Sequence, residues 1–254
     1  KEVSFAYKQR YKGKMYSVTT RSGRKITVTP EHPFFSIDGG VIKTKVKDLS
    51  AGTFVAVPRE LILTPTSLLS NAAQDSFSSF RSQNGPQIRY KAYRRPAKTF
   101  KPIDYVNPDV AELFGYLLSE GASTGGTMFF FNSDRNLVDR VEDLSCEIFG
   151  ISPRIKPDTS ENVLRLEISS IGLIKYLEQT HGFKLAGSRN TRVPTSIMTS
   201  GNEMVSRFLS AVFESEASIR KDVPEIEFTT ASKEFANQLS YLLLRFGIVG
   251  RVKQ

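Results

Sequence analysis

The stretch LFGYLLSEGAS at residues 113–123 decides the fold, because LSAVFESEASI at residues 209–219 repeats its design. Each is an apolar helical run that ends in one glutamate, Glu120 or Glu216, followed by a small residue. The C-terminal end of a helix carries a partial negative charge, so a carboxylate there is unfavourable. Stability alone would favour lysine at this place, and the repetition therefore indicates a function for the two carboxylates.

These stretches begin an internal repeat. The equivalent pairs in the two helical runs are Leu113 with Leu209, Gly115 with Ala211, Ser119 with Ser215, and Gly121 with Ala217. After one residue of slippage, residues 127–156 align with residues 224–253, and IFGISPRIK matches RFGIVGRVK at Phe, Gly, Ile, Arg and Lys. Each half is expected to run helix, strands, helix, strands, which makes the chain an internal pseudo-dimer. We predict an α+β domain over residues 109–254, with halves at about 109–200 and 201–254.

Small residues recur on one face of each predicted helix. Gly115 and Ser119 lie four residues apart in the first helix, and Ala211 and Ser215 do the same in the second. Helices that pack along such strips approach closely, and both would then end together beside a pseudo-twofold axis. The two terminal glutamates would repel each other, and Mg²⁺, which prefers oxygen ligands, would relieve that repulsion. The alternative is that each glutamate only faces water at a helix end.

With these features the chain resembles the double-motif LAGLIDADG homing endonucleases found inside inteins. Residues 113–121 match the first motif, with Glu120 at its acidic position, and residues 209–217 match the second, with Glu216 there. The resemblance implies a pseudo-twofold αββαββα fold in which the motif helices form the interface and their glutamates bind Mg²⁺. It further implies a saddle of two antiparallel sheets on double-stranded DNA and cleavage of both strands by metal-assisted hydrolysis.

The resemblance also implies an auxiliary catalytic lysine near each acidic centre. Lys233 in TTASKEF lies near that place in the second half, and its counterpart in the first half is Asn136, with Arg135 beside it. The alternative for Lys233 is a solvated residue in the first turn of a helix. Ala217 replaces the usual glycine of the second motif, and alanine adopts the left-handed conformation poorly, so we expect a distorted metal site on that side.

Residues 1–64 are predicted to form a small all-β segment, because YSVTT, KITVTP, FFSI, VIKTKV and FVAVP are separated by turn sequences. VTPEHPFF contains Thr29-x-x-His32, which resembles the splicing motif of Hint domains, in which Thr and His polarise the scissile peptide at the N-terminal junction. The following VKDLSAGTFVAVPR resembles the strand pair that comes next in such domains. A lone Thr-x-x-His is ordinarily a turn, but its place before this segment and an endonuclease repeat favours the splicing motif.

The two ends of the sequence depart from those of a complete intein. Splicing needs a nucleophilic Cys or Ser at the first residue and a His-Asn pair at the end, whereas this sequence starts with Lys1 and ends with Gln254. The second half of the repeat also stops before the strand and helix that follow the equivalent point of the first half. We therefore expect a fragment that does not splice by itself and that missing intein segments or the host protein would complete.

Residues 65–108 are rich in Ser, Gln and Pro and are predicted to be a linker or an extended arm. No acidic residue occurs between Ser76 and Ile103, and aromatic residues lie between the basic ones. This mixture suits phosphate contacts and base stacking, so the arm is predicted to bind DNA; the alternative is a solvated linker. The candidate DNA-binding residues are Arg81, Arg89, Lys91, Arg94, Arg95, Lys98 and Lys101.

The net charge of +9 at pH 7 favours a polyanionic partner. The single cysteine, Cys146, excludes an internal disulfide and fits a reducing compartment. No apolar run approaches the roughly 20 residues of a membrane span, and the N-terminus is no signal peptide, so a soluble, cytoplasmic monomer is expected. Three functions stay open: a site-specific double-strand endonuclease of intein origin, a DNA-binding remnant that no longer cuts, and a splicing element with the nuclease insert as scaffold.

Overall fold

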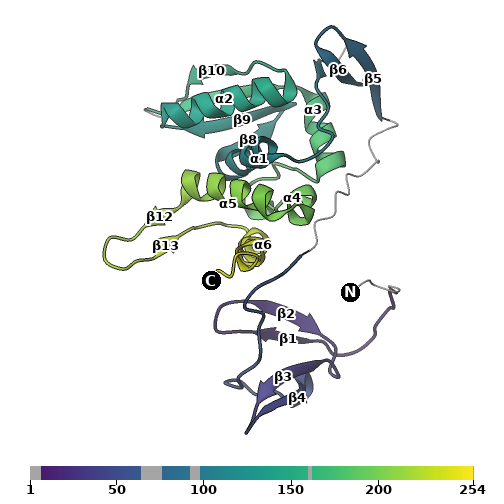
Figure 1. The fold of residues 1–254 in the computed structure, drawn as a ribbon, viewed down its shortest axis with the longest axis vertical. Coiled ribbons are helices and arrows are strands. Elements are labelled where there is room, and N and C mark those ends of the chain that lie inside the picture. Colours follow the sequence, from purple (N-terminus) through teal and green to yellow (C-terminus); the bar gives the residue numbers. More distant parts are fainter. Residues whose placement is uncertain (1–6, 64–75, 92–97, 160–161, 254) are drawn as a thin grey trace.

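The structure is a computed structural model that describes residues 7–63, 76–91, 98–159 and 162–253. Helices and small antiparallel sheets alternate along the chain (Figure 1), in agreement with the predicted α+β class. Within these ranges, no helix combines the length and the apolar character that crossing a membrane requires.

Two β-hairpins make up the N-terminal region. The strands are β1 (Tyr16–Thr19), β2 (Lys25–Val28), β3 (Pro33–Ile37) and β4 (Val41–Lys45), and the short 3₁₀ helix η1 (Val46–Asp48) follows them. β1 pairs antiparallel with β2, and β3 pairs antiparallel with β4. The fifth predicted run, FVAVP, forms no strand, although Val55 makes an isolated bridge to Ser36 and the Ala56 N–H donates to the Phe35 carbonyl oxygen at 2.8 Å. Val28 and Val46 are buried here, whereas Phe35 and Phe54 are exposed.

A three-stranded sheet occupies part of the segment that was expected to be a linker. β5 (Phe77–Ser82), β6 (Gly85–Tyr90) and β7 (Thr99–Phe100) pair antiparallel in this order. Phe77 and Phe100 are buried, and their ring centroids lie 5.7 and 5.5 Å from that of Tyr176. The prediction of a linker or an extended arm is therefore wrong for these residues, because they form a sheet of which one face packs on a helix of the following domain.

The first half of the repeat runs helix, two strands, helix, two strands, helix. Its elements are α1 (Pro108–Glu120), β8 (Gly121–Thr124), β9 (Thr127–Asn132), α2 (Arg135–Phe149), β10 (Arg154–Pro157), β11 (Leu164–Ser169) and α3 (Ile171–Tyr176). The strands form an antiparallel sheet in the order β10-β11-β9-β8. Helices α1 and α2 both pack against β9.

Capping residues define the ends of these helices. The Asn107 side chain accepts a 2.8 Å hydrogen bond from the Val110 N–H, and Pro108 occupies the first position of α1. The Asp134 side chain accepts from the Asn136 N–H at the start of α2. α2 ends at Phe149, and the capping residue Gly150 adopts the left-handed conformation with φ 66°.

A connecting segment leads to the second half. It contains η3 (Leu177–His181), which is a π-helix, the 3₁₀ helix η4 (Ser188–Asn190), and α4 (Thr195–Thr199). The second half then consists of α5 (Asn202–Glu216), β12 (Ser218–Ile219), β13 (Ile226–Glu227) and α6 (Lys233–Leu244). This order repeats the first four elements of the first half, and Gly247, which aligns with Gly150, is also left-handed, with φ 70°.

Candidate active site at the α1–α5 interface

Helices α1 and α5 lie side by side and pack along their small residues (Figure 1). A Cβ atom added to Gly115 would lie 2.7 Å from the Cβ of Ala211 and 2.7 Å from the carbonyl oxygen of Phe208. Only glycine at position 115 allows the two backbones to approach this closely. The predicted packing along small residues is therefore confirmed at the point where the helices meet.

The serines of the two strips turn their hydroxyl groups back onto their own helices. Ser119 Oγ donates to the carbonyl oxygen of Gly115 at 3.1 Å, and Ser215 Oγ donates to that of Ala211 at 2.8 Å. Each hydroxyl is thus satisfied within its helix and needs no partner from the opposite one. The strips consequently behave as small, smooth surfaces that permit close packing.

Glu120 and Glu216 are the last residues of α1 and α5, and because these helices pack side by side with Tyr116 bonded to Glu214, both glutamates lie at the same end of the interface. Partial burial of the carboxyl group, followed by the negative charge of Glu120, raises the pKa of Glu216 to about 7. Burial also raises the pKa of Glu120. The two carboxyl groups therefore lie close enough to repel, although Glu120 is half-buried and Glu216 as a whole residue is exposed.

The pair fits a cation whose remaining ligands are water molecules and, when a substrate is bound, phosphate oxygens. Within the described parts of the chain, no group of three or more His, Cys, Asp and Glu side chains could hold a metal ion. Mg²⁺ commonly uses only one or two carboxylates and takes further oxygen ligands from substrate phosphates and water. Two mutually repelling carboxylates suit such a site, whereas they would not make an all-protein cage.

The residues after the two glutamates adopt the same backbone conformation. Gly121 has φ −101° and ψ 152°, and Ala217 has φ −80° and ψ 146°, so both are extended. The expected distortion at Ala217 is therefore wrong, because neither position requires the left-handed region. Glycine is needed at position 121 for space, since a Cβ there would lie 1.9 Å from the carbonyl oxygen of Leu117.

A pocket of about 160 Å³ lies beside Glu216. Its walls come from the end of α1, the loop at residues 185–188 with Thr191, residues 229–231 and Phe235. Lys233, the predicted auxiliary lysine, is the exposed first residue of α6, two positions after the end of that wall. By position in its helix its counterpart is Arg135, the first residue of α2, whose Nε donates to Asp139 at 2.7 Å.

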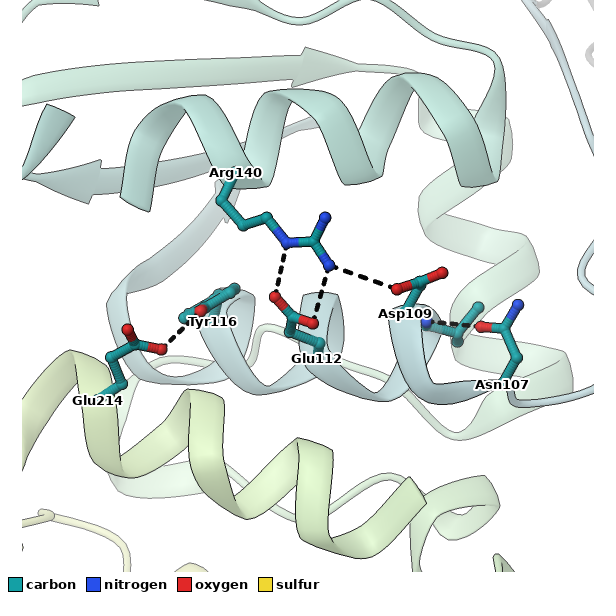
Figure 2. Close-up of polar contacts among 7 residues, drawn as sticks. Asn107, Asp109, Glu112, Tyr116, Arg140 and Glu214 are labelled. Carbon is teal, nitrogen blue, oxygen red and sulfur yellow. Dashed lines mark hydrogen bonds and ion pairs between the residues drawn. The ribbon is translucent and has the colours of Figure 1, made fainter. Parts of the chain in front are cut away.

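A polar network on α1 ties this helix to both of its neighbours (Figure 2). Arg140 of α2 donates from Nε to Glu112 Oε1 at 2.7 Å and from Nη2 to Glu112 Oε2 at 3.0 Å. Its Nη2 also donates to Asp109 at 3.3 Å. On the α5 side, the Tyr116 hydroxyl donates to Glu214 Oε2 at 2.7 Å. This network was not predicted from the sequence, although Asp109, Glu112 and Tyr116 recur at helical spacing along one face that continues to Glu120.

The predicted splicing motif forms a tight turn between β2 and β3. The His32 N–H donates to the carbonyl oxygen of Thr29 at 3.0 Å, and the Val46 N–H donates to the carbonyl oxygen of His32 at 2.9 Å. Thr29 is half-buried, and the exposed His32 ring lies edge-on to Phe34 with centroids 5.5 Å apart. Both residues thus occupy the ends of one turn.

The basic residues of the predicted arm fall into different environments. Arg81, Arg89, Lys91 and Lys98 are exposed, and the Arg89 guanidinium lies over the Phe80 ring at 5.3 Å. Lys101 instead donates from Nζ to the Glu147 carbonyl oxygen at 3.3 Å, in the last turn of α2. Lys101 therefore serves as a helix-end cation in this structure, and its assignment as a DNA contact is not supported by its position. Arg94 and Arg95 lie outside the described residues.

A second basic surface, which was not predicted from the sequence, lies on the outward face of the sheet β10-β11-β9-β8. The register places Arg154, Glu167 and Phe129 in one row, and Lys156, Arg165 and Phe131 in the next. The rings of Phe129 and Phe131 stack with centroids 6.1 Å apart, and Arg165 lies 5.9 Å over Phe129. Glu167 pairs with Lys156 at 3.1 Å and with Arg165 at 3.0 Å. Alternation of these residues with buried apolar ones was the available signal, but only strand pairing brings the rows together.

Comparisons with known proteins supply the family context. A family model described as the intein splicing domain matches residues 1–237. An A-type ATP synthase protein of Pyrococcus abyssi is 27% identical over 249 residues, covering 94% of this chain and 22% of the relative. The probable translation initiation factor IF-2 of Thermococcus kodakarensis is 25% identical over 295 residues, covering 99% and 25%. The replication factor C small subunit of Methanocaldococcus jannaschii is 26% identical over 260 residues, covering 100% and 12%. The chain thus spans a quarter or less of the length of these curated relatives.

Proposed function

Because the chain belongs to the intein splicing-domain family, we propose that it is an intein-derived, site-specific DNA endonuclease in which Glu120 and Glu216 hold Mg²⁺ at a phosphodiester. The observation that carries this proposal is the pairing of the two carboxylates at the ends of closely packed helices, where they repel each other. Such an arrangement is unfavourable without a cation and favourable with one.

The relatives support the interpretation of this chain as an element inserted into a longer host protein. They are named for ATP synthesis, translation initiation and replication, yet a stretch similar to this chain makes up a quarter or less of each. A shared segment inside proteins of unrelated function is expected of an intein, and a nuclease that cuts DNA is one means by which such an element spreads. The functions of these host proteins therefore say little about the activity of this segment.

In the proposed reaction, each part of the site has a separate role. Bound Mg²⁺ would supply Lewis-acid stabilisation of the negative charge that develops at the scissile phosphate. Glu120 and Glu216 would contribute the protein ligands, and Lys233 would add positive charge near the pocket beside Glu216. The outward face of β10-β11-β9-β8, with Arg154, Lys156 and Arg165, and the exposed side of β5-β6-β7 would hold the duplex by phosphate contacts.

Cleavage of a library of DNA duplexes in Mg²⁺ tests the proposal. Wild-type protein is expected to cut a subset of sequences, and Glu120→Gln and Glu216→Gln should each abolish cutting while DNA binding persists. Glu147→Gln, on the exposed surface of α2, is the matched control and should cut normally. Salt-sensitive DNA binding by wild type with no cut or nicked product would reject the nuclease in favour of a DNA-binding remnant.

The family match also favours a second candidate, a protein-splicing element in which the nuclease-like region is a scaffold. Its support is that the match extends from residue 1 and includes the Thr29–His32 turn. Fusion of the chain to segments with a Cys at the N-terminal junction and His-Asn at the C-terminal one should then yield ligated flanks. His32→Ala should block cleavage at the N-terminal junction, and failure of the wild-type fusion to ligate would reject this candidate.

A further inference from the structure

One directional contact crosses the α1–α5 interface close to the paired glutamates. The Tyr116 hydroxyl donates to Glu214 Oε2 at 2.7 Å (Figure 2), and Tyr116 as a residue is only 4% exposed. Tyr116 lies one helical turn before Glu120, and Glu214 lies two residues before Glu216. Burial and the neighbouring Glu214 carboxylate raise the pKa of the Tyr116 phenol, so it stays a hydrogen-bond donor at neutral pH.

Tyr116 is itself held in place by the polar network on α1. The guanidinium of Arg140 donates two parallel hydrogen bonds to the Glu112 carboxylate. This bidentate geometry fixes the orientation of the two side chains as well as the distance between them. Because Glu112 and Tyr116 are four residues apart on the same face, the anchoring of α1 to α2 also fixes the turn that carries Tyr116. Through its hydrogen bond with Glu214, the fixed Tyr116 side chain then restrains the position of α5.

The contact exists on one side of the repeat only. Val212 and Leu118 occupy the positions equivalent to Tyr116 and Glu214, and both are buried apolar residues. The rest of the contact between α1 and α5 is made by small and apolar residues, and the two serine hydroxyls are satisfied within their own helices. Contacts of this kind allow close approach, but unlike a hydrogen bond they are not directional.

We propose that Tyr116 and Glu214 form a clasp between the helices that fixes the axial position of α5 against α1 and so sets the spacing of Glu120 and Glu216; Tyr116 is thus a positioning residue for the metal site. This inference rests on the proposed function. Magnesium accepts ligands only within a narrow distance of about 2.0–2.1 Å. A helix shift well below the rise of about 1.5 Å per residue would therefore disrupt the pair.

Mn²⁺ titration of the protein alone, followed by the electron paramagnetic resonance signal of free Mn²⁺, tests the clasp. Tyr116→Phe keeps the buried ring and removes the hydroxyl, and it should weaken Mn²⁺ binding by at least about tenfold, as loss of a supporting contact typically does. Glu214→Leu should weaken binding to the same extent. Glu214→Gln retains an acceptor oxygen for the tyrosine and should stay within about threefold of wild type.

Tyr176→Phe is the matched control for a purely structural effect. Its buried hydroxyl, on α3, donates to the Ile103 carbonyl oxygen at 2.9 Å and accepts from the Ile103 N–H at 3.0 Å, so neither partner belongs to α1 or α5. Both tyrosine variants should lower the melting temperature, but only Tyr116→Phe should change Mn²⁺ affinity. Equal Mn²⁺ affinities for the two variants would overturn the positioning role.

A double-variant cycle separates failure of the clasp from failure of the proposed function. Tyr116→Phe and Glu214→Leu should be strongly non-additive in unfolding experiments, since each removes the same hydrogen bond. If wild type and Glu120→Gln alike bind no Mn²⁺ while the non-additivity persists, the metal site fails and the positioning role falls with it. If wild type binds Mn²⁺ and the two changes are additive, the metal site stands and the clasp is rejected.

Discussion

Gly115 of α1 faces the backbone of Phe208 in α5 so closely that the space where its Cβ would stand is already occupied. The nearest atoms, at 2.7 Å from that position, are the Ala211 Cβ and the Phe208 carbonyl oxygen. Neither is the free end of a flexible side chain, so a larger residue at position 115 must push the two helices apart. The carboxylates at the ends of these helices depend on the same approach.

Gly115→Ala is therefore expected to destabilise the protein by about 1–3 kcal/mol, the usual range for overpacking. Urea unfolding followed by circular dichroism measures the change. Gly40→Ala is the control, because a Cβ there would meet no atom within 4 Å, and it should leave the unfolding midpoint unchanged. Similar midpoints for the two variants would show that the helices can separate without loss.

The raised pKa of Glu216 predicts that stability falls as pH rises. The folded-state value of about 7 exceeds the unfolded value of about 4.3, so the folded protein binds this proton more tightly. The contribution is fully present below the unfolded pKa and is lost as pH increases through about 7. Urea midpoints at pH 5 and pH 8 should differ less in Glu216→Gln than in wild type or in Glu147→Gln, which is altered on the exposed surface of α2.

Mg²⁺ binding by the same two carboxylates is expected to depend on pH. Mg²⁺ binds the ionised form, so added Mg²⁺ should raise the urea midpoint of wild type at pH 8 much more than at pH 5. Glu216→Gln should show little response at either pH. An equal Mg²⁺ response in wild type and Glu216→Gln would place the bound cation elsewhere on the protein.

The paired glutamates could be predicted from sequence because the signal is local and repeated. Small residues four apart identify a close-packing face, and a glutamate at the end of each apolar run identifies the shared end of the helices. The sheet at residues 77–100 could not be predicted in this way. Its inward residues Phe77, Ile88 and Phe100 are spread over three short strands in a Ser- and Gln-rich segment, and their partner Tyr176 is remote in sequence.

Long-range polar contacts were likewise beyond local sequence patterns. The bond between Arg140 and Glu112 joins two helices that are separated by a hairpin, and no spacing rule pairs one arginine among many with one carboxylate. Lys101 shows the same difficulty in reverse. By composition Lys101 belongs with the basic residues of the arm. In the structure the end of α2 lies next to it, and its ammonium group donates a hydrogen bond to the Glu147 carbonyl oxygen there.

Loss of Arg140 should be much more damaging than loss of the similar ion pair on the same helix. Arg140→Met leaves the Glu112 carboxylate, in a residue only 8% exposed, without its charged partner, a loss of about 1–3 kcal/mol. Arg135→Met removes an i,i+4 pair with Asp139 of the same 2.7 Å length, worth about 0.3–0.5 kcal/mol. Urea unfolding should separate the two variants, and adding Glu112→Leu to Arg140→Met should recover part of the loss. No recovery would mean that Arg140 acts through packing of its aliphatic stem.

Measurements of DNA affinity should distinguish Arg89, as a phosphate contact, from Lys101, although both belong to the basic arm by composition. Arg89 lies on the exposed face of β5-β6-β7, in a row with Ser78 and Thr99 and over the Phe80 ring, where a phosphate can reach it. Arg89→Ala should weaken binding to all duplexes alike and reduce the slope of log affinity against log salt by about 0.9, the loss of one phosphate contact.

Lys101→Ala should leave that slope unchanged, because its Nζ binds the Glu147 carbonyl oxygen at the end of α2. The variant should instead lower the free energy of unfolding by about 0.3–1 kcal/mol, the usual worth of a cation at a helix C-terminus. Fluorescence anisotropy with a labelled duplex at several salt concentrations gives the slopes, and urea unfolding gives the stabilities. A reduced slope for Lys101→Ala with unchanged stability would return Lys101 to the DNA-binding surface and would mean that the helix-end contact opens when DNA binds.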